Sequence, residues 1–321
     1  MLDDRSITAS KNGVGSALPI VSVLICSRDR PEALARCLES VLSQRYPQSE
    51  IVVLDDASRR DIVETLEPCF RGASIRWVRS EQRLGVAGAR NRLVQEAAGE
   101  ILVFLDDDAV LESPDALGTV VTFFSRTPEL GTLAFKIMAR INGHVDLQVP
   151  FSRRWRKRNP LLTESTGPVS YYVGAGHAIR KEAFRRCGLY QESLVYGDEE
   201  LDHAYRQVEA GFSLVYTPEV LVDHFPAASE VESERDGRKE LFYVVRNRIW
   251  NAYKHIPLPY LVSYVGVWVL YFLAASIRER HLGEFLRGAY TGFAGFRSLP
   301  RKPLDALAVA YLRANYGRLW Y

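Results

Sequence analysis

The chain has 321 residues, 47% hydrophobic and 25% charged, which is an ordinary globular composition with enough apolar side chains for a large core. The net charge of +2 excludes a protein that binds polyanions over its whole surface, so we expect no nucleic-acid partner. The N-terminus has no apolar segment, which predicts no secretory signal. Residues 1–17 are polar and rich in Gly and Ser, which predicts a disordered N-terminus.

The first 110 residues alternate between strand-like and helix-like patterns. Apolar runs rich in β-branched residues predict strands over 20–26, 50–54, 75–78 and 101–105. Helical spacing after Pro31 and over 86–98 predicts helices between them. This alternation predicts right-handed βαβ crossovers, and therefore an α/β fold with a Rossmann-like, mainly parallel sheet flanked by helices.

Polar residues follow three of these strands at the point where each one ends. They are Ser27 after the first strand, Asp55 and Asp56 after the second, and Asp106, Asp107 and Asp108 after the fourth. The carboxyl ends of parallel strands lie along one edge of a sheet, where open α/β folds bind ligands. Helix capping or a solvated acidic turn explains some of these acids. Their convergence at one edge favours a ligand site.

The acids after the fourth strand have the spacing of a metal site. Side chains alternate along a strand, so Asp106 and Asp108 project to one side and Asp107 to the other. Two such carboxylates can hold one Mg²⁺ or Mn²⁺, with substrate phosphates and water as further ligands. No Gly-rich phosphate loop follows the first strand, which argues against NAD binding and P-loop chemistry. A nucleotide diphosphate neutralised by the metal fits this arrangement.

Two further features of the first half fit the same ligand. Asp55 or Asp56 can accept a hydrogen bond from a base N–H or a ribose hydroxyl. Arg90, on the predicted helix 86–98, can pair with phosphate or with the strand-end acids. The alternative for Arg90 is an ordinary solvated residue on a helix surface.

The second half carries more strand and helix patterns. A helix is predicted from Pro114 to about Phe124, and strands over 133–141, 171–179, 214–216 and 220–222. Gly174 and Gly176 interrupt the strand-like pattern, which often marks close approach of the backbone to a ligand. The basic run 153–158 predicts a solvated loop or, alternatively, a contact with an anionic acceptor or with lipid headgroups.

An acidic cluster opens a predicted helix after Gly197. Glu199, Glu200 and Asp202 lie in its first turn, where the helix dipole stabilises negative charge. With Asp198, this is more acid than capping needs, so one of them is a candidate general base.

With these segments identified, the chain resembles the family 2 glycosyltransferases of GT-A fold. The resemblance is carried by residues 21–32, 51–58, 86–108, 174–184 and 197–224. It implies inverting transfer of a sugar from a nucleotide-diphosphate sugar, such as a UDP- or dTDP-sugar, to an acceptor hydroxyl, with Mg²⁺ or Mn²⁺. It extends to bacterial enzymes of cell-surface polysaccharide or glycolipid synthesis, rhamnosyltransferases among them.

By position, the resemblance implies roles for individual residues. Asp106, Asp108 and His224 resemble the metal ligands, and Glu200 falls on the catalytic base, with Glu199 before it. Glu stands where the family usually has Asp, which leaves open which of these two glutamates is the base. With the residues indicated by pattern alone, the expected nucleotide-sugar-binding set is Ser27, Asp55, Asp56, Arg90, Asp106, Asp107, Gly176 and Arg206.

Two other functions are compatible with parts of the sequence. A nucleotidylyltransferase also uses Mg²⁺ and a Rossmann-like sheet, but it needs a Gly-rich basic loop after the first strand, and 27–31 has no Gly. A non-catalytic nucleotide-binding membrane scaffold with a decayed site is the other alternative. The acids retained at all three places argue against it.

A C-terminal helical segment over 236–321 is predicted to follow the glycosyltransferase domain, 18–235. Residues 256–276 carry no charge over 21 positions, long enough for the ~30 Å bilayer core, and 283–296 suits an interfacial helix. From Arg278 onward the chain has eight Arg or Lys and three Asp or Glu. We expect peripheral or monotopic attachment to the cytoplasmic membrane face and a lipid-linked or glycan acceptor. Packing of these helices on the catalytic domain is the alternative.

Overall fold

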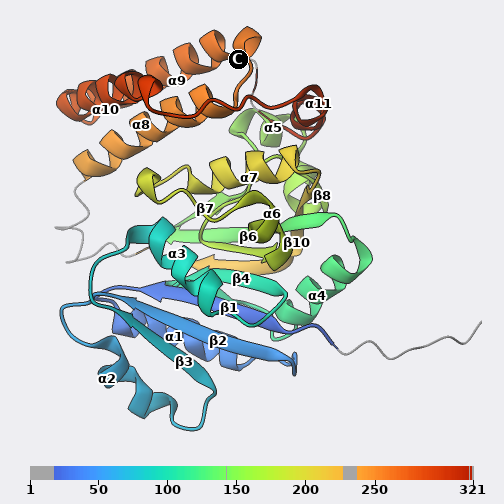
Figure 1. The fold of residues 1–321 in the computed structure, drawn as a ribbon. Coiled ribbons are helices and arrows are strands. Elements are labelled where there is room, and N and C mark those ends of the chain that lie inside the picture. Colours follow the sequence, from blue (N-terminus) through green and yellow to red (C-terminus); the bar gives the residue numbers. More distant parts are fainter. Residues whose placement is uncertain (1–17, 142, 227–236, 318, 320–321) are drawn as a thin grey trace, which may run out of the picture.

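The structure is a computed structural model that describes residues 18–141, 143–226, 237–317 and 319. Four parallel strands in the order β3-β2-β1-β4 form one half of a ten-stranded sheet (Figure 1). They are β1 (Val21–Ser27), β2 (Ser49–Asp56), β3 (Ile75–Ser80) and β4 (Ile101–Asp106). All four predicted strands are present. The predicted disorder of 1–17 and the predicted boundary at 235/236 lie outside the described residues.

The other half of the sheet is mixed, so the prediction of a mainly parallel sheet describes the first half only. Beyond β4 the strands run in the order β9-β6-β10-β5, with β7 paired to β6 and β8 to β10. Only β6 and β10 pair in parallel there. These strands are β5 (Ala109–Leu111), β6 (Leu130–Ile141), β7 (His144–Gln148), β8 (Gly167–Pro168), β9 (Gly176–Arg180) and β10 (Ser213–His224).

The two short strands predicted over 214–216 and 220–222 are one strand, β10. Its register against β6 shifts between Thr217 and Leu221, and Pro218 lies in this irregularity. Proline has no N–H for the ladder, and a bulge lets the strand continue past it. The strand predicted over 171–179 is shortened to β9.

Helices cover both faces of the sheet (Figure 1). On one face lie α1 (Pro31–Leu42), α2 (Ile62–Leu66) and α4 (Ala116–Arg126), packed on Val23, Ile25 and Val103. On the other lie α3 (Gly85–Glu96), α6 (Lys181–Cys187) and α7 (Glu199–Glu209), packed on Leu24, Leu102 and Phe104. Alternate residues of β1 and β4 therefore supply the two halves of the core, as the period of a strand requires. The basic run forms a short helix, α5 (Arg153–Arg158), instead of a loop.

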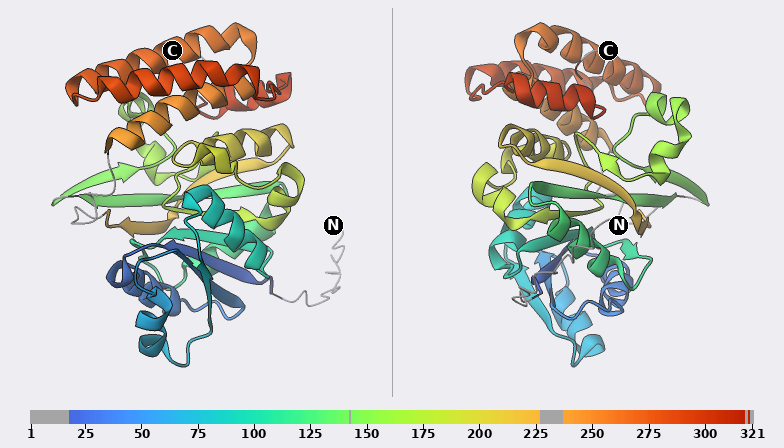
Figure 2. Two further views of the ribbon diagram at one scale, coloured as in Figure 1. Left: turned by 60° about the vertical axis from the view of Figure 1, so that its left-hand side comes forward. Right: turned by 90° about the vertical axis from the view of Figure 1, so that its right-hand side faces the viewer.

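The C-terminal helices form a layer over α7 (Figures 1 and 2). They are α8 (Gly237–His255), α9 (Leu258–Arg278), α10 (Leu282–Ala294) and α11 (Ala306–Ala314). Ile256, Tyr264 and Leu312 belong to the same buried cluster as the sheet residues Leu24 and Phe104. The layer is thus continuous with the core of the sheet domain.

Two glycines let α10 pack closely on α8. A Cβ on Gly288 would lie 2.7 Å from the carbonyl oxygen of Phe242, and one on Gly292 would lie 2.9 Å from Cδ1 of Ile249. Because the atom facing Gly288 belongs to the backbone, a side chain there would separate the two helices.

The outer side of this layer is apolar and exposed. α9 is the single helix of the described residues that is long and apolar enough to cross a membrane. Only 17% of its most apolar stretch of 18 residues is buried. Val262 and Leu270 of α9 and Tyr290 of α10 are exposed by 82%, 65% and 77%.

A buried aspartate joins α7 to α8. Asp202, which is 0% exposed, accepts hydrogen bonds from Arg206 at 2.8 Å and from His255 at 2.9 Å, and it pairs with Lys254. Burial opposes its ionisation. The hydrogen bond from His255 and the charges of Arg206, His255 and Lys254 outweigh burial and hold the pKa of Asp202 well below its usual range.

We expect Asp202→Asn to lower the free energy of unfolding by about 3–5 kcal/mol at neutral pH, because it leaves buried cations without their partner. Since the folded pKa lies below the ~3.9 of unfolded Asp, this stabilisation is present above about pH 4 and is lost as the pH falls further. The variant should therefore lose stability less steeply in acid. Urea unfolding at several pH values measures both effects. The matched control is Asp115→Asn, in an exposed pair with Arg45, and a cost equal to that control would contradict the prediction.

Candidate active site

A cavity of about 440 Å³ opens at the carboxyl ends of β1, β2 and β4, within the size range of ligand-binding pockets. Eight of the predicted site residues line it: Ser27, Asp56, Arg90, Asp106, Asp107, Glu199, Glu200 and His224. The strand register explains part of this convergence, because Ser27 lies beside Asp55 and Cys26 beside Asp106.

Three side chains form a candidate metal centre: Asp106 and His224 line one end of the cavity, and the buried Asp108 contacts His224 without lining the cavity itself. Ligand atoms of Asp106, Asp108 and His224 lie within 4.8 Å of one another. The chain turns after β4, and β5 then pairs antiparallel with β10 so that Ala109 lies opposite His224. This pairing brings a histidine over 110 residues further along the chain to the two aspartates. Two carboxylates and one imidazole fit Mn²⁺ or Mg²⁺, with positions left for phosphate oxygens.

The negative charge of this centre raises the pKa of His224. Its Nε2 lies 3.1 Å from Oδ1 of Asp108 and 4.0 Å from Oδ2 of Asp106. Burial disfavours the imidazolium, but the hydrogen bond to Asp108 and the charges of both aspartates outweigh it and raise the pKa of His224. Negative charge that favours a protonated imidazole also favours a bound metal cation.

Arg30, which the sequence reasoning did not single out, contacts the aspartates of this part of the site. Its guanidinium donates to Oδ2 of Asp108 at 2.6 Å and pairs with both oxygens of Asp107. The Ser27 hydroxyl donates to Asp107 at 2.7 Å. Burial raises the pKa of Asp107 to about 7, helped by the charge of Asp108 and opposed by Arg30. Arg30 therefore occupies Oδ2 of Asp108, while Oδ1 of the same carboxylate lies beside His224.

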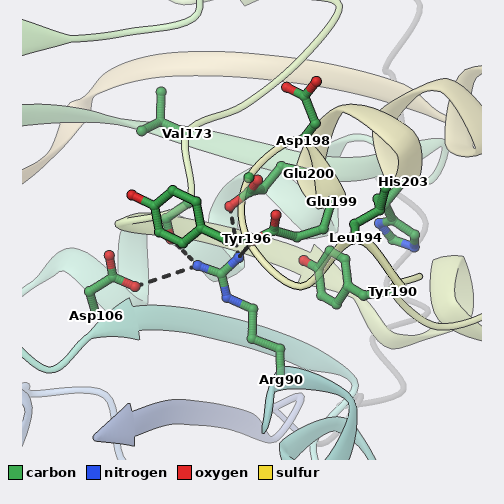
Figure 3. A network of polar contacts seen from close by, with 12 residues as sticks. Arg90, Asp106, Val173, Tyr190, Leu194, Tyr196, Asp198, Glu199, Glu200 and His203 are labelled. Atoms are coloured by element: carbon green, nitrogen blue, oxygen red, sulfur yellow. Dashed lines mark hydrogen bonds and ion pairs between the residues drawn. The ribbon is translucent and has the colours of Figure 1, made fainter. Parts of the chain in front are cut away.

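Arg90 connects the metal centre to the acidic helix α7 (Figure 3). Its Nη1 donates to Glu200 at 2.7 Å and to Glu199 at 3.2 Å. Its Nη2 lies 3.1 Å from the carbonyl oxygen of Gly174 and 3.4 Å from Oδ1 of Asp106. Burial opposes the charge, but the carboxylates outweigh it and raise the pKa of Arg90. The predicted alternative of a solvated helical arginine is therefore wrong.

The two glutamates of α7 differ in their surroundings. Glu199 is 3% exposed, and burial, with the charge of Glu200, raises its pKa to about 8. Its Oε2 is buried and has no hydrogen-bond partner among the described residues. The Glu200 side chain is 16% exposed and has the shorter contact with Arg90. At neutral pH Glu199 is thus largely protonated, and Glu200 is the more accessible carboxylate.

A model of the family described as Glycosyl transferase family 2 matches residues 22–188, which include β1 to β4, both strand-end acid groups and Arg90. The chain belongs to glycosyl transferase family 2. The family prediction made from the sequence motifs is confirmed.

Two curated relatives are similar to more than half of this chain. Polypeptide N-acetylgalactosaminyltransferase 15 of Mus musculus is 26% identical over 284 residues, which cover 78% of this chain and 44% of the mouse protein. The poly-beta-1,6-N-acetyl-D-glucosamine synthase of Staphylococcus epidermidis is 29% identical over 206 residues, which cover 63% of this chain and 48% of that protein. The chain therefore spans about half the length of these curated relatives.

Two solved structures share the fold. GalNAc-T7 with UDP, GalNAc and Mn²⁺ superposes with a TM-score of 0.62 at 19% identity, covering 88% of this chain and 59% of that one. TarS 1–349 of S. aureus in complex with UDP gives a TM-score of 0.59 at 14% identity, covering 93% of each chain. The predicted GT-A fold is confirmed.

Three residues of the expected nucleotide-sugar set do not line the cavity in this family 2 protein. Asp55 is buried, pairs with Arg79 and accepts from the Ser58 N–H at 2.9 Å. Arg206 pairs with Asp202 and donates to three backbone carbonyls, those of Cys187, Gly188 and Leu189. Both side chains have structural partners that no sequence pattern indicated.

Gly176 is the third of these residues, and its neighbour Gly174 is the glycine that approaches the site. A Cβ on Gly176 would lie 3.0 Å from Val222 inside the sheet, whereas one on Gly174 would lie 2.1 Å from Oε1 of Glu200 and 2.9 Å from Arg90. Gly174 is thus the position where the absence of a side chain leaves room for the Arg90–Glu200 pair.

Proposed function

We propose that this protein is a metal-dependent inverting glycosyltransferase that moves a sugar from a UDP- or dTDP-sugar to an acceptor hydroxyl. The observation that carries the proposal is one cavity with a metal-type triad at one end and the Glu199–Glu200 pair at the other, joined by Arg90. Family membership supports a nucleotide-sugar donor.

In this proposal, Asp106, Asp108 and His224 hold Mn²⁺ or Mg²⁺. When bound there, the ion neutralises the departing nucleotide diphosphate as a Lewis acid. Asp56 accepts from the backbone N–H groups of Leu84 and Gly85 at 2.6 and 3.1 Å, which fixes its carboxylate at the cavity wall for the nucleoside. Arg30 and Ser27 act through Asp107 and Asp108, as positioning residues.

Glu200 is the proposed general base. It takes the proton of the acceptor hydroxyl as that oxygen attacks the anomeric carbon, opposite the leaving diphosphate, so the configuration inverts. Arg90 donates to Glu200 at 2.7 Å and so fixes the direction in which its carboxylate points. Glu199, the preceding residue, is a neutral carboxyl at neutral pH because burial raises its pKa to about 8.

The test is incubation of the full chain with UDP-, dTDP- and GDP-sugars and Mn²⁺ or Mg²⁺. We expect slow hydrolysis of one donor, and NMR of the first sugar released should give the inverted anomer. Release of pyrophosphate from a nucleoside triphosphate and a sugar phosphate would instead identify a nucleotidylyltransferase. Tight nucleotide binding without any turnover would identify a non-catalytic scaffold.

We further propose that the outer faces of α9 and α10 dock on the cytoplasmic leaflet of a membrane and present the cavity to a lipid-linked or glycan acceptor. Two observations support this: the exposed apolar surface of these helices and the excess of Arg and Lys from Arg278 onward. Because α8 and α11 belong to the core, a test should alter the surface and leave the segment in place.

Replacing Val262, Leu270 and Tyr290 together with Ser should lower binding to mixed zwitterionic and anionic phospholipid vesicles by at least about tenfold, since one large apolar side chain contributes ~1.5–3 kcal/mol when buried. Vesicle co-sedimentation is the measurement. The matched control replaces Leu42, Ile141 and Val145, which are exposed on the sheet domain, with Ser. Equal binding by both variants would rule out the membrane proposal. So would a wild-type chain that stays soluble without detergent and does not co-sediment with vesicles.

A further inference from the structure

The loop that leads into α7 has an unusual backbone. Val195, Gly197 and Asp198 have φ angles of 60°, 75° and 68°. Positive φ is unfavourable for a side chain with a Cβ, and most of all for a β-branched one such as Val195. Glu199 and Glu200 follow directly, and Tyr196 lines the cavity with them. The position of the proposed base therefore depends on what holds this loop in its strained form.

The loop is held by α8, from the C-terminal layer. The side-chain nitrogen of Asn247 lies 2.6, 2.9 and 2.8 Å from the carbonyl oxygens of Leu194, Tyr196 and Gly197. Asn247 is 0% exposed, so these bonds are made away from water. The two N–H groups of one buried amide are thus shared among three carbonyl oxygens of this turn.

Arg248 holds the next residue of the loop, and we refer to Asn247 and Arg248 together as the clamp. Its guanidinium makes a two-pronged pair with the Asp198 carboxylate, at 2.7 and 2.6 Å. Asn251, one turn further along α8, donates to the Asp198 carbonyl oxygen at 2.8 Å. In Figure 3 the Asp198 carboxylate points away from Arg90, while Glu200 points toward it. Arg248 therefore fixes Asp198, which precedes α7, and Arg90 fixes Glu200, which lies in the first turn of α7.

The clamp also connects to the apolar outer layer. The Arg248 guanidinium lies 4.0 Å from the ring centroid of Trp268 on α9, a cation–π distance. A chain of direct contacts thus runs from α9 through Arg248 and Asp198 to Glu199 and Glu200.

We infer that Asn247 and Arg248 are positioning residues for the Glu200 carboxylate, so that the C-terminal helical layer is a working part of the active site. This inference rests on the proposed function. Glu200 fits a tight space, since Gly174 has no room for a Cβ beside it. A loop released from the clamp would relax from positive φ and shift Glu200 relative to the acceptor. A displacement of about 1 Å at such a group typically costs ~10²-fold in rate.

The test compares Arg248→Gln, Asp198→Asn, their double variant and Asn247→Ala in the full chain. We expect kcat to fall by ~10²-fold in each single variant, with KM for the donor and Kd for UDP with Mn²⁺ within about twofold of wild type. Because Arg248 and Asp198 act as one pair, the double variant should be no slower than the slower single variant. Arg248→Lys, which keeps the charge, should recover part of kcat. The matched control is Arg287→Gln, an exposed arginine of α10 that pairs with Glu284.

Thermal unfolding of every variant separates positioning from simple packing. If the melting temperature falls while kcat per folded molecule stays within twofold, the clamp is structural only and the inference is wrong. It is also wrong if nucleotide affinity falls in step with kcat, because the whole cavity has then deformed. A wild-type chain without turnover on any donor would instead disprove the proposed function, and with it this inference.

Discussion

Glu200→Gln is expected to lower sugar transfer by ~10²–10⁴-fold while the affinity for the nucleotide sugar stays unchanged. A positioned general base contributes that much, and Gln keeps the size of Glu but cannot take the acceptor proton. Initial rates with saturating acceptor give kcat. Calorimetry with UDP and Mn²⁺ gives the donor-site affinity independently of turnover.

The neighbouring glutamate is the matched control for this prediction. Glu199 is buried and its pKa is raised to about 8 by burial and by Glu200, so below that pH it is mostly neutral already. Glu199→Gln therefore replaces one neutral group with another, and we expect less than about a tenfold loss. If Glu199→Gln carries the large loss and Glu200→Gln is near wild type, the base has been assigned one residue too late.

The strand-end acids could be predicted because each of them depends on local sequence. The run 101–105 predicts a buried strand, and parallel strands bring Asp56 and Asp106 to the same edge. Asp106 and Asp108 do approach His224 together, but β4 ends at Asp106, so the turn before β5 places Asp108 there and strand alternation does not.

Partners that come from distant elements could not be predicted in this way. Arg30 binds acids 77 and 78 residues away, and Arg248 binds Asp198 across 50 residues. No periodicity in either segment indicates such a pair. Arg206 was expected at the ligand, but the carbonyl groups at 187–189 and Asp202 hold it, and a family motif does not reveal competing structural partners.

The C-terminal segment shows where a helix pattern is ambiguous. One face of α8 carries Val245 and Ile249, which are buried against α9 and α10. The opposite face of α8 carries Asn247, Arg248 and Asn251, which would be taken as solvated from the sequence alone. They are instead hydrogen-bonded to the loop before α7. Burial of a polar face against another element is a tertiary property, which amphipathic patterning alone does not show.

The metal centre gives the second large expected effect. Asp108→Asn should weaken Mn²⁺-dependent UDP binding by at least about tenfold, since loss of even a group that only supports a metal ligand typically costs ~10–100-fold. The fold should survive, because Arg30 keeps its contacts with Asp107 and Asn fills the same volume. Adding EDTA to wild type should reduce UDP affinity to the level of the variant, and EDTA should have little further effect on the variant itself.

Calorimetry of UDP binding with Mn²⁺, with Mg²⁺ and with EDTA measures this prediction in the full chain. The matched control is Asp115→Asn, an exposed carboxylate that pairs with Arg45 and does not line the cavity. It removes the same charge outside the cavity, so it separates a change in net charge from loss of a ligand. His224→Gln should fall between the two, because it removes one ligand atom and leaves both carboxylates. If Asp108→Asn binds UDP with Mn²⁺ as tightly as wild type does, the ion is held elsewhere, and the triad formed where β4, β5 and β10 meet serves another purpose.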